Sequence, residues 1–462
     1  MKALTLGKRI TSLLLCASVT GAVFSGCKKS DDMFPSIEPS VEQAQESEPG
    51  EQVVPDKSDE DKIQQLSVAL PYSDLTIQCL VSMLYCKNNG KWDSSEDGLT
   101  VDTDYLSSVA TNYVVTNVGC GNSGANLEMI DAWRISGAIP DLFLAQDSRS
   151  VWEAGYCSEL NDSLADNPYL NNQMIYADAL EAESEKGVFF AVPHCCSAEI
   201  LMGNTQYIPA ESGKLQTKCT AEELRTYLEA IKAENPSVAG ISGAYELIPY
   251  LGSAFNGDMP TSYMVYDEYM SNPEEAKKII DVSASYVRAL YSDSLAMDQI
   301  DGKDPIFAKK TALWIGSSAD VRTWAEYYPD SLYMLHLPCD NATNVGVPYI
   351  STYSLCVSKT SRNKDFAAEF AAFISFDPDA QLLIYRLENM TGFMPITRNE
   401  AVWSLVSNDE LFGYMASDFR QIMDNAVYCP SSYDNNIFAN TTEYAAGFVK
   451  GTEEFSPEKC YG

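Results

Sequence analysis

The chain of 462 residues carries 65 Asp and Glu against 31 Lys and Arg, which gives a formal net charge of −34 at pH 7. So acidic a chain argues against nucleic acid or an anionic membrane surface as its partner, because both would repel it. The length exceeds that of one usual domain and suggests two.

The N-terminus has the pattern of a secretory signal peptide. A basic start precedes an apolar run over residues 10–24, which is too short to span a bilayer comfortably. Small residues then lead to Cys27, as in a bacterial lipobox, although Phe24 stands where Leu is usual. We expect residues 1–26 to be removed and Cys27 to carry a lipid. Ordinary cleavage with an unmodified Cys27 is the alternative.

The segment after Cys27 is expected to be a disordered acidic tether. Residues 28–64 hold one aromatic side chain, Phe34, with four prolines and many acids. Their low hydrophobicity and dense charge leave too little apolar burial to offset chain entropy. Residues 27–64 are therefore assigned to a lipid-bearing cysteine and a flexible leash that reaches roughly 35 Å on average.

The remaining chain alternates short apolar runs with amphipathic stretches, which is typical of an α/β fold. Apolar runs predict strands at residues 65–70, 113–118 and 140–145, and extended segments at 188–192 and 199–202. Amphipathic stretches predict helices at residues 75–85, 126–135, 221–232, 273–291 and 364–375. The cysteines beyond Cys27 follow no compact disulfide spacing, so we expect most of them to be small buried side chains.

Six segments between residues 66 and 403 occur in the order of one known family. They include GAIPDLF at 137–143, TAEEL at 220–224, SKTSRNK at 358–364 and TGFMP at 391–395. Together they resemble the family 1 extracellular solute-binding proteins, the maltose-binding-like group. Lys310 stands where that pattern prefers Gly.

The resemblance implies a two-lobed periplasmic-binding-protein-like α/β fold, with a ligand cleft between the lobes and three hinge crossings. The crossings are expected near Ala191, Phe307 and Val357. The first lobe would comprise residues 65–190 plus 308–357, and the second residues 191–307 plus 358–462.

The resemblance also implies a function. The protein would be lipid-anchored on the extracellular side of the cell membrane, with no other membrane contact. It would capture a small ligand, with a sugar or oligosaccharide expected, and deliver it to the permease subunits of an ABC importer. It would not be an enzyme and would need no cofactor or metal.

Candidate ligand contacts are polar and aromatic residues that follow predicted strands, where open α/β sheets bind ligands, or that lie where family members carry contacts. Sugar sites combine flat aromatic faces with polar groups. The candidates are Tyr72, Ser73, Asp74, Gln146, Asp147, Ser197, Tyr245, Glu246, Asn256, Trp314, Ser317, Tyr353 and Phe438.

Two other patterns favour simpler interpretations. Gly119, Gly121 and Gly124 have the spacing of a dinucleotide fingerprint, but the preceding strand is the second one, so a glycine loop at the cleft rim is preferred. His194-Cys195-Cys196 suggests a metal, but adjacent strand residues point to opposite faces and cannot easily share one ion.

Two alternative functions stay open. One is a surface-anchored glycan-degrading enzyme, which would need two carboxylates held across one bond. The 65 acids allow many pairs and single out none. The other is a ligand sensor of the same fold that acts on a receptor.

Overall fold

Residues 64–145 build the first part of a mixed sheet. The computed structural model describes residues 63–92, 101–121, 124–165, 167, 169–170, 177–251, 255, 273–338, 350–388, 394–411, 413–424 and 446–448. Strand β1 (Gln64–Ala69) lies between β2 (Tyr113–Asn117) and β3 (Leu142–Ala145) and is parallel to both. The three strands confirm the apolar runs predicted there.

Helices α2 (Asp74–Asn88) and α4 (Leu127–Ser136) follow β1 and β2, close to their predicted bounds. Each begins at a side chain that accepts from a backbone N–H of the first turn, Ser73 in α2 and Asn126 in α4. Such caps satisfy amide donors that lack a partner inside the helix. Because both caps lie directly after or near strand ends, they fix where the chain turns from strand to helix.

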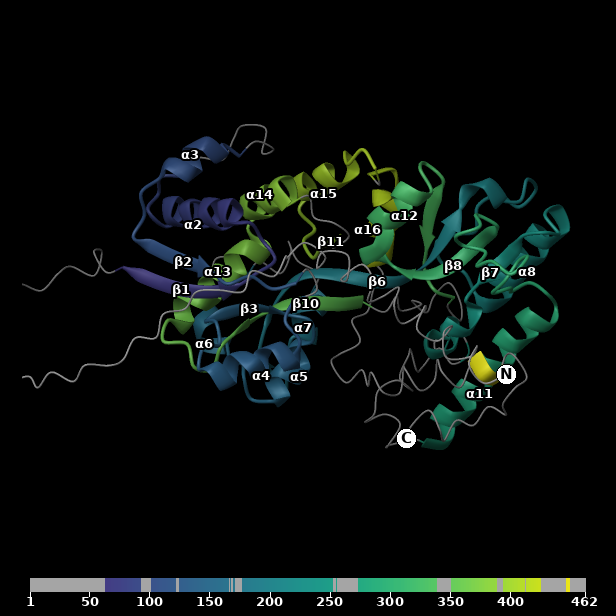
Figure 1. The fold of residues 1–462 in the computed structure, drawn as a ribbon, viewed down its shortest axis with the longest axis horizontal. Coiled ribbons are helices and arrows are strands. Elements are labelled where there is room, and N and C mark those ends of the chain that lie inside the picture. Colours follow the sequence, from purple (N-terminus) through teal and green to yellow (C-terminus); the bar gives the residue numbers. More distant parts are fainter. Residues whose placement is uncertain are drawn as a thin grey trace, which may run out of the picture. The chain divides into compact units, whose positions relative to one another are not determined.

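One long strand, β6 (Val192–Asn204), belongs to both halves of the sheet (Figure 1). Its first half pairs antiparallel with β10 (Ile350–Val357), which also pairs with β3. Its second half pairs with β8 (Thr311–Ser317) and β9 (Leu332–Leu335). Of the two predicted extended segments, 199–202 lies within β6. The other, 188–192, covers the short strand β5 (Val188–Phe189), which pairs with β4 (Ser184–Glu185), and only the first residue of β6.

The second half of the sheet continues from β8 to β7 (Ala239–Ser242), and these two strands are parallel. Helix α8 (Ala221–Glu234) precedes β7, and its capping box joins Thr220 and Glu223. Helix α11 (Pro273–Ser292) and the 3₁₀ segment η3 (Ala244–Tyr250) pack together beyond β7. A buried apolar cluster of α8, η3, α11 and β8 forms the core of this half.

The chain then returns to the first half of the sheet. Helix α13 (Lys364–Phe376) packs on β6, β10, β1 and β3, and α14 (Pro378–Glu388) packs on α2. Next, β11 (Met394–Pro395) pairs with β6, α15 (Glu400–Ser407) packs on α14 and α16 (Ala416–Asp424) packs on β9. The return to the second half therefore runs past β11.

The division into lobes differs from the expected one. Residues 308–357 were assigned to the first lobe, but β8 and β9 lie beside β6 and β7 in the second half of the sheet. Helices α13 and α14, expected in the second lobe, pack on the first half. No crossing occurs near Phe307. The reason is that an apolar run predicts a strand but not its partner, and the four-residue β7 gives little periodic signal.

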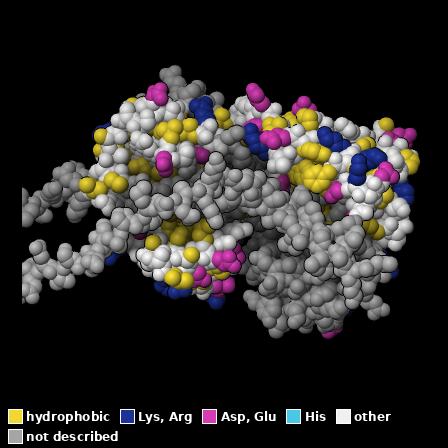
Figure 2. All heavy atoms as spheres, viewed as in Figure 1, with side chains coloured by type: hydrophobic (Ala, Val, Ile, Leu, Met, Phe, Trp, Pro, Cys, Tyr) yellow, Lys and Arg dark blue, Asp and Glu magenta, His cyan; other side chains and the backbone are white. Residues whose placement is uncertain are grey.

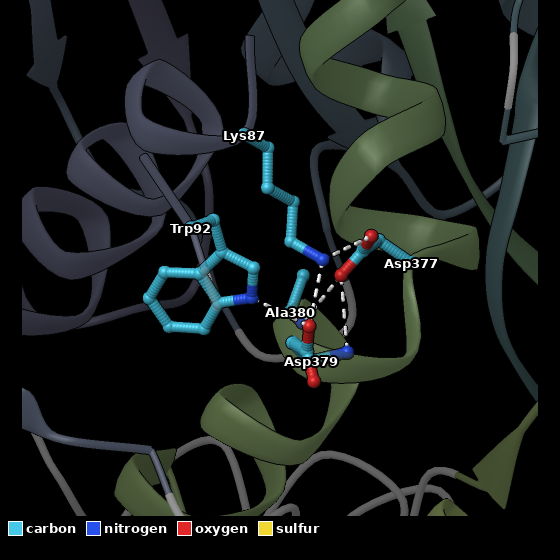
Figure 3. Close-up of polar contacts among 5 residues, drawn as sticks. All are labelled: Lys87, Trp92, Asp377, Asp379 and Ala380. Carbon is cyan, nitrogen blue, oxygen red and sulfur yellow. Dashed lines mark hydrogen bonds and ion pairs between the residues drawn. The ribbon is translucent and has the colours of Figure 1, made fainter. Parts of the chain in front are cut away.

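A buried ion network joins α2 to α14 (Figure 3). The Lys87 ammonium lies 2.8 Å from an Asp377 carboxylate oxygen and 2.7 Å from one of Asp379. The Trp92 ring N–H donates to Asp379 at 2.8 Å, and Asp377 accepts from the backbone N–H groups of Asp379 and Ala380 at the start of α14. Burial raises the pKa of Asp377, while Lys87 opposes the rise. The network holds the end of α2 against the start of α14.

Two observations concern the remaining sequence expectations. Seven of the eight cysteines within the described ranges are buried and all eight are free thiols, as expected for small apolar side chains. Among the helices that the structure describes, none is both long and apolar enough to cross a membrane.

Candidate functional site

Several predicted contact residues meet at one edge of the second half of the sheet. The parallel strands β7 and β8 both end there, so Tyr245 and Glu246 after β7 share this edge with Ser317, the last residue of β8. Glu199 of β6 lies directly opposite Ser317. Carboxyl ends of neighbouring parallel strands are where open α/β sheets bind ligands.

Strands β6 and β10 add two more predicted residues beside this edge. Ser197 of β6 lies opposite Ser351 of β10, and its side chain hydrogen-bonds to Tyr353. Burial, with a smaller contribution from the nearby carboxylates of Glu199 and Asp320, raises the pKa of Tyr353 to about 12, while the hydrogen bond with Ser197 opposes the rise. Ser197, Ser317 and Tyr353, which are far apart in sequence, therefore surround the same acidic side chains.

The carboxylates of Glu199 and Glu246 are close enough for Glu246 to raise the pKa of Glu199 by charge repulsion. Burial raises the pKa of Glu199 to about 7, followed by repulsion from Glu246 and Asp320. Burial likewise raises the pKa of Glu246 to about 7, with repulsion from Asp298 and Asp304, while the Tyr245 hydroxyl hydrogen-bonds to this carboxylate and opposes the rise. Among the residues that the structure describes, no basic side chain contributes to either pKa. Within that part of the chain, this edge therefore offers hydrogen-bond acceptors whose charge has no cationic partner.

Backbone geometry places Glu246 there. Gly243 adopts φ 69°, a left-handed conformation that permits a tight turn directly after β7. The Glu246 N–H donates to the Gly243 carbonyl at 2.9 Å. Asp298 accepts from the Gly243 N–H at 3.3 Å and from the Tyr291 hydroxyl at 2.5 Å, which anchors the turn to the end of α11.

In the first half of the sheet, Gln146 and Asp147 follow β3 and are exposed. The Gln146 N–H donates to the Ala125 carbonyl at 3.0 Å. Asp147 caps α5 (Ser148–Glu153) by accepting from the Ser150 N–H at 3.0 Å. Both side chains therefore stand at the carboxyl end of β3, as predicted, on a fixed backbone.

A buried carboxylate, Glu183, connects this region to β10. It accepts hydrogen bonds from the Ser148 hydroxyl at 2.6 Å and from the Thr352 and Ser354 hydroxyls at 2.5 and 2.7 Å. Burial raises its pKa and the three hydroxyl groups oppose the rise. The three hydroxyl donors compensate for the loss of water around this carboxylate. Glu183 therefore fixes α5 relative to β10.

Four predicted contacts lie elsewhere. Tyr72 is buried, and its hydroxyl contacts the His194 ring. The Ser73 N–H and hydroxyl both donate to Glu388 of α14 at 2.8 Å, while Asp74 is exposed in the first turn of α2. Trp314 is 1% exposed and stacks on Tyr328 with ring centroids 5.2 Å apart. In this conformation neighbouring side chains cover both aromatic rings.

Three further predictions fall outside the described residues: the contacts Asn256 and Phe438, and the lipidation site Cys27.

Sequence reasoning missed Glu183, Glu199 and Asp320. Glu199 gave a signal, because it is the single acid in the mostly apolar strand over residues 192–202. An acid inside a buried strand needs a partner or a functional reason. Glu183 and Asp320 lie in short connections, where an acid usually means only solvent exposure.

The glycine pattern has a packing role. A side chain at Gly124 would meet the Leu144 carbonyl oxygen at 2.8 Å, and the neighbouring Ala125 pairs with Ala145. Only glycine allows this approach. The Asp141 carboxylate is already hydrogen-bonded within the sheet. It accepts from the Ser67 N–H at 2.8 Å and from the Ser67 hydroxyl at 2.7 Å, which links the start of β3 to β1.

The histidine pattern is also accounted for by packing. His194 lies between the Tyr72 hydroxyl and the Ser375 hydroxyl, and burial lowers its pKa to about 3. Such an imidazole stays neutral at physiological pH. Figure 2 shows no histidine on the surface in view, which agrees with the burial of His194 and His336. Among the described residues, no group of three His, Cys, Asp or Glu side chains could hold a metal ion.

Comparison with solved structures identifies the architecture. The sugar-binding protein MalE from Xanthomonas citri matches with a TM-score of 0.62 at 13% identity, over 86% of this chain and 94% of its own. The substrate-binding protein Lmo0181 from Listeria monocytogenes, solved in complex with cycloalternan, matches with a TM-score of 0.57 at 15% identity, over 87% and 96%.

A family 1 extracellular solute-binding protein from Alicyclobacillus acidocaldarius matches with a TM-score of 0.57 at 11% identity, over 87% of this chain and 97% of its own. No family model and no curated protein matches the sequence. These three neighbours are binding proteins rather than enzymes. The chain therefore has the two-lobed α/β fold of the ABC solute-binding proteins, as the resemblance to family 1 implied.

Proposed function

We propose that this protein is a lipid-anchored extracellular solute-binding protein that captures a sugar or oligosaccharide and delivers it to the permease subunits of an ABC importer. The observation that carries the proposal is the fold, which covers 86% of the chain in its match to a sugar-binding protein. The proposed role is binding without turnover, with no cofactor.

The chemistry of the candidate site supports a hydroxyl-rich ligand. Glu199, Glu246 and Asp147 offer acceptor oxygens, and Tyr245 and Tyr353 are half-buried aromatic rings beside two of them. Sugars present hydroxyl donors at their edges and apolar C–H faces, which suit this combination. The same acceptors would repel carboxylates and phosphates. We infer that neutral or amine-bearing sugars bind better than sugar acids.

A thermal-shift screen of the protein against sugars, oligosaccharides, sugar acids, amino acids and polyamines tests the proposal. A ligand that binds only the folded state raises Tm, by the equivalent of about 2.7 kcal/mol at a hundredfold excess over Kd. A Tm rise with one class of neutral sugar, without product formation, is expected. Hydrolysis of the ligand would contradict the proposal, and so would a Tm rise only with sugar acids.

The proposed membrane attachment rests on Cys27 alone. Replacing it in the full precursor, Cys27→Ser, should release the protein from the membrane fraction, because the acceptor of the lipid is lost. Fractionation of cells and detection of the protein in the medium provide the measurement. A Cys16→Ser precursor is the matched control, since Cys16 lies inside the segment that is removed. Membrane retention of the Cys27→Ser protein would contradict the lipid anchor.

A further inference from the structure

The first half of the sheet carries a groove at the end away from the candidate ligand site. Its volume is about 620 Å³, within the range of small-molecule pockets. Its walls come from β1, β2, the connection between α4 and β3, and the turn between β10 and α13.

The groove and the candidate site lie at opposite ends of the same strands. Gln65 and Ser67 of the groove stand near the start of β1, and Asp141 directly precedes β3. Gln146 and Asp147 of the candidate site follow the end of β3. A strand of six residues such as β1 spans about 20 Å, so a ligand in the groove would not touch the candidate site.

Two guanidinium groups from separate segments line the groove. Arg134 belongs to the last turn of α4, and Arg362 to the turn before α13. The Arg134 ion pair runs through Nε to Asp131 at 3.2 Å, and both side chains are about half exposed. Within the described ranges, Arg362 makes no ion pair. In a chain with 65 acids and 31 basic residues, two arginines on one groove are a local exception.

The acid that lines the groove, Asp141, is hydrogen-bonded to β1. Asp141 directs one carboxylate oxygen to the Ser67 N–H and hydroxyl, at 2.8 and 2.7 Å, while its own N–H donates to the Ser67 hydroxyl at 3.0 Å. The Asn363 side chain donates to the Gln65 carbonyl at 2.7 Å. These polar groups have hydrogen-bond partners inside the protein, whereas Arg362 is exposed and makes no ion pair within the described ranges.

Apolar side chains also line the groove, together with the polar Thr116 and Thr360. Leu66, Val114 and Ile139 line the groove, and Val114 is 46% exposed. Apolar side chains beside guanidinium groups suit a ligand that has an apolar body and a charged head.

We propose that this groove binds a small amphipathic oxyanion, a carboxylate or phosphate on an apolar body, with Arg134 and Arg362 at the charged group. Arginine forks match the geometry of carboxylate and phosphate oxygens. This site is separate from the proposed sugar site and does not depend on it. It would bind with or without a sugar present.

Isothermal titration calorimetry of the mature protein at low ionic strength tests the proposal, with phenyl phosphate, benzoate and inorganic phosphate as probes. At least one aromatic probe should bind with a Kd below about 1 mM and more tightly than inorganic phosphate. The tighter of the two aromatic probes identifies the charged group as phosphate or carboxylate. Absence of binding by both, or equal affinity for inorganic phosphate, would overturn the proposal.

Variants locate the site. Arg134→Gln and Arg362→Gln should each weaken binding of the aromatic probe about tenfold. Lys359→Gln is the matched control, because it removes one exposed cation near the groove that does not line it. Its affinity should stay within about twofold of the parent. An equal loss in all three variants would overturn the site, since it would report only general attraction. Unchanged Tm values verify that the variants fold.

Discussion

Glu199 illustrates how a single side chain reports on the state of the candidate site. It lies in a mostly apolar, buried strand, opposite Ser317 and near Glu246 and Asp320. Its pKa is about 7 in the folded protein, against 4.5 for an ordinary glutamate. The folded state therefore holds the proton more tightly than the unfolded chain does. Stability from this group is present below about pH 4.5 and is lost as pH rises through 7.

We expect Glu199→Gln to raise Tm at pH 8 and to have little effect at pH 5. At pH 8 the gain in unfolding free energy should be about 1 to 2 kcal/mol, less than the roughly 3 kcal/mol of the unscreened shift. Thermal unfolding of both proteins at the two pH values provides the measurement. The exposed Glu326→Gln serves as control. A lower Tm for Glu199→Gln at pH 8 would mean that the carboxylate has a stabilising partner.

At the scale of elements, one lysine supplies the cation of the ion network between α2 and α14. Lys87, Asp377 and Asp379 have side chains that are 18%, 6% and 13% exposed. Removing the cation leaves two carboxylates buried near each other without compensation. The same contact positions α14, whose Glu388 accepts from Ser73 at the start of α2.

Lys87→Met should reduce the free energy of unfolding by about 3 to 5 kcal/mol at pH 7. The loss should shrink at acidic pH, because the pKa of Asp377 is raised by burial and its protonation removes the repulsion between the two side chains. Urea unfolding at pH 7 and pH 4 provides the measurement. Lys91→Met is the matched control, since Lys91 is exposed at the same end of α2. Equal losses in the two variants would show that the buried network contributes nothing particular.

The elements themselves were largely predictable, and their pairing was not. Residues 364–375 and 221–232 carry amphipathic periodicity, and α13 and α8 match them closely. Of β6, the predicted extended segments covered only residues 199–202 and the first residue, Val192, because the strand is buried on both faces and shows no alternation of apolar and polar side chains. The role of Glu183 could not be predicted, because the hydroxyl groups that donate hydrogen bonds to it lie 35 to 171 residues away in the sequence.

At the scale of the whole molecule, ligand binding is expected to draw the two lobes together. Hinge closure is a known response of two-lobed binding proteins. Small-angle scattering with saturating sugar should show a radius of gyration smaller by on the order of 1 Å, against roughly 21 Å for a compact chain of about 400 residues. A non-binding sugar from the thermal screen is the control. An unchanged radius at saturation would argue against closure.

The sharing of β6 has a consequence for how the protein comes apart. Backbone hydrogen bonds on its first half hold β10, and those on its second half hold β8 and β9. If either half of the sheet unfolded alone, it would leave backbone hydrogen-bond donors and acceptors of β6 without partners, while β6 remained part of the folded half. Neither half is then a separable folding unit, although lobes are often discussed as domains. Denaturation should be one cooperative event, and the amide protons of β6 should be among the last to exchange with solvent.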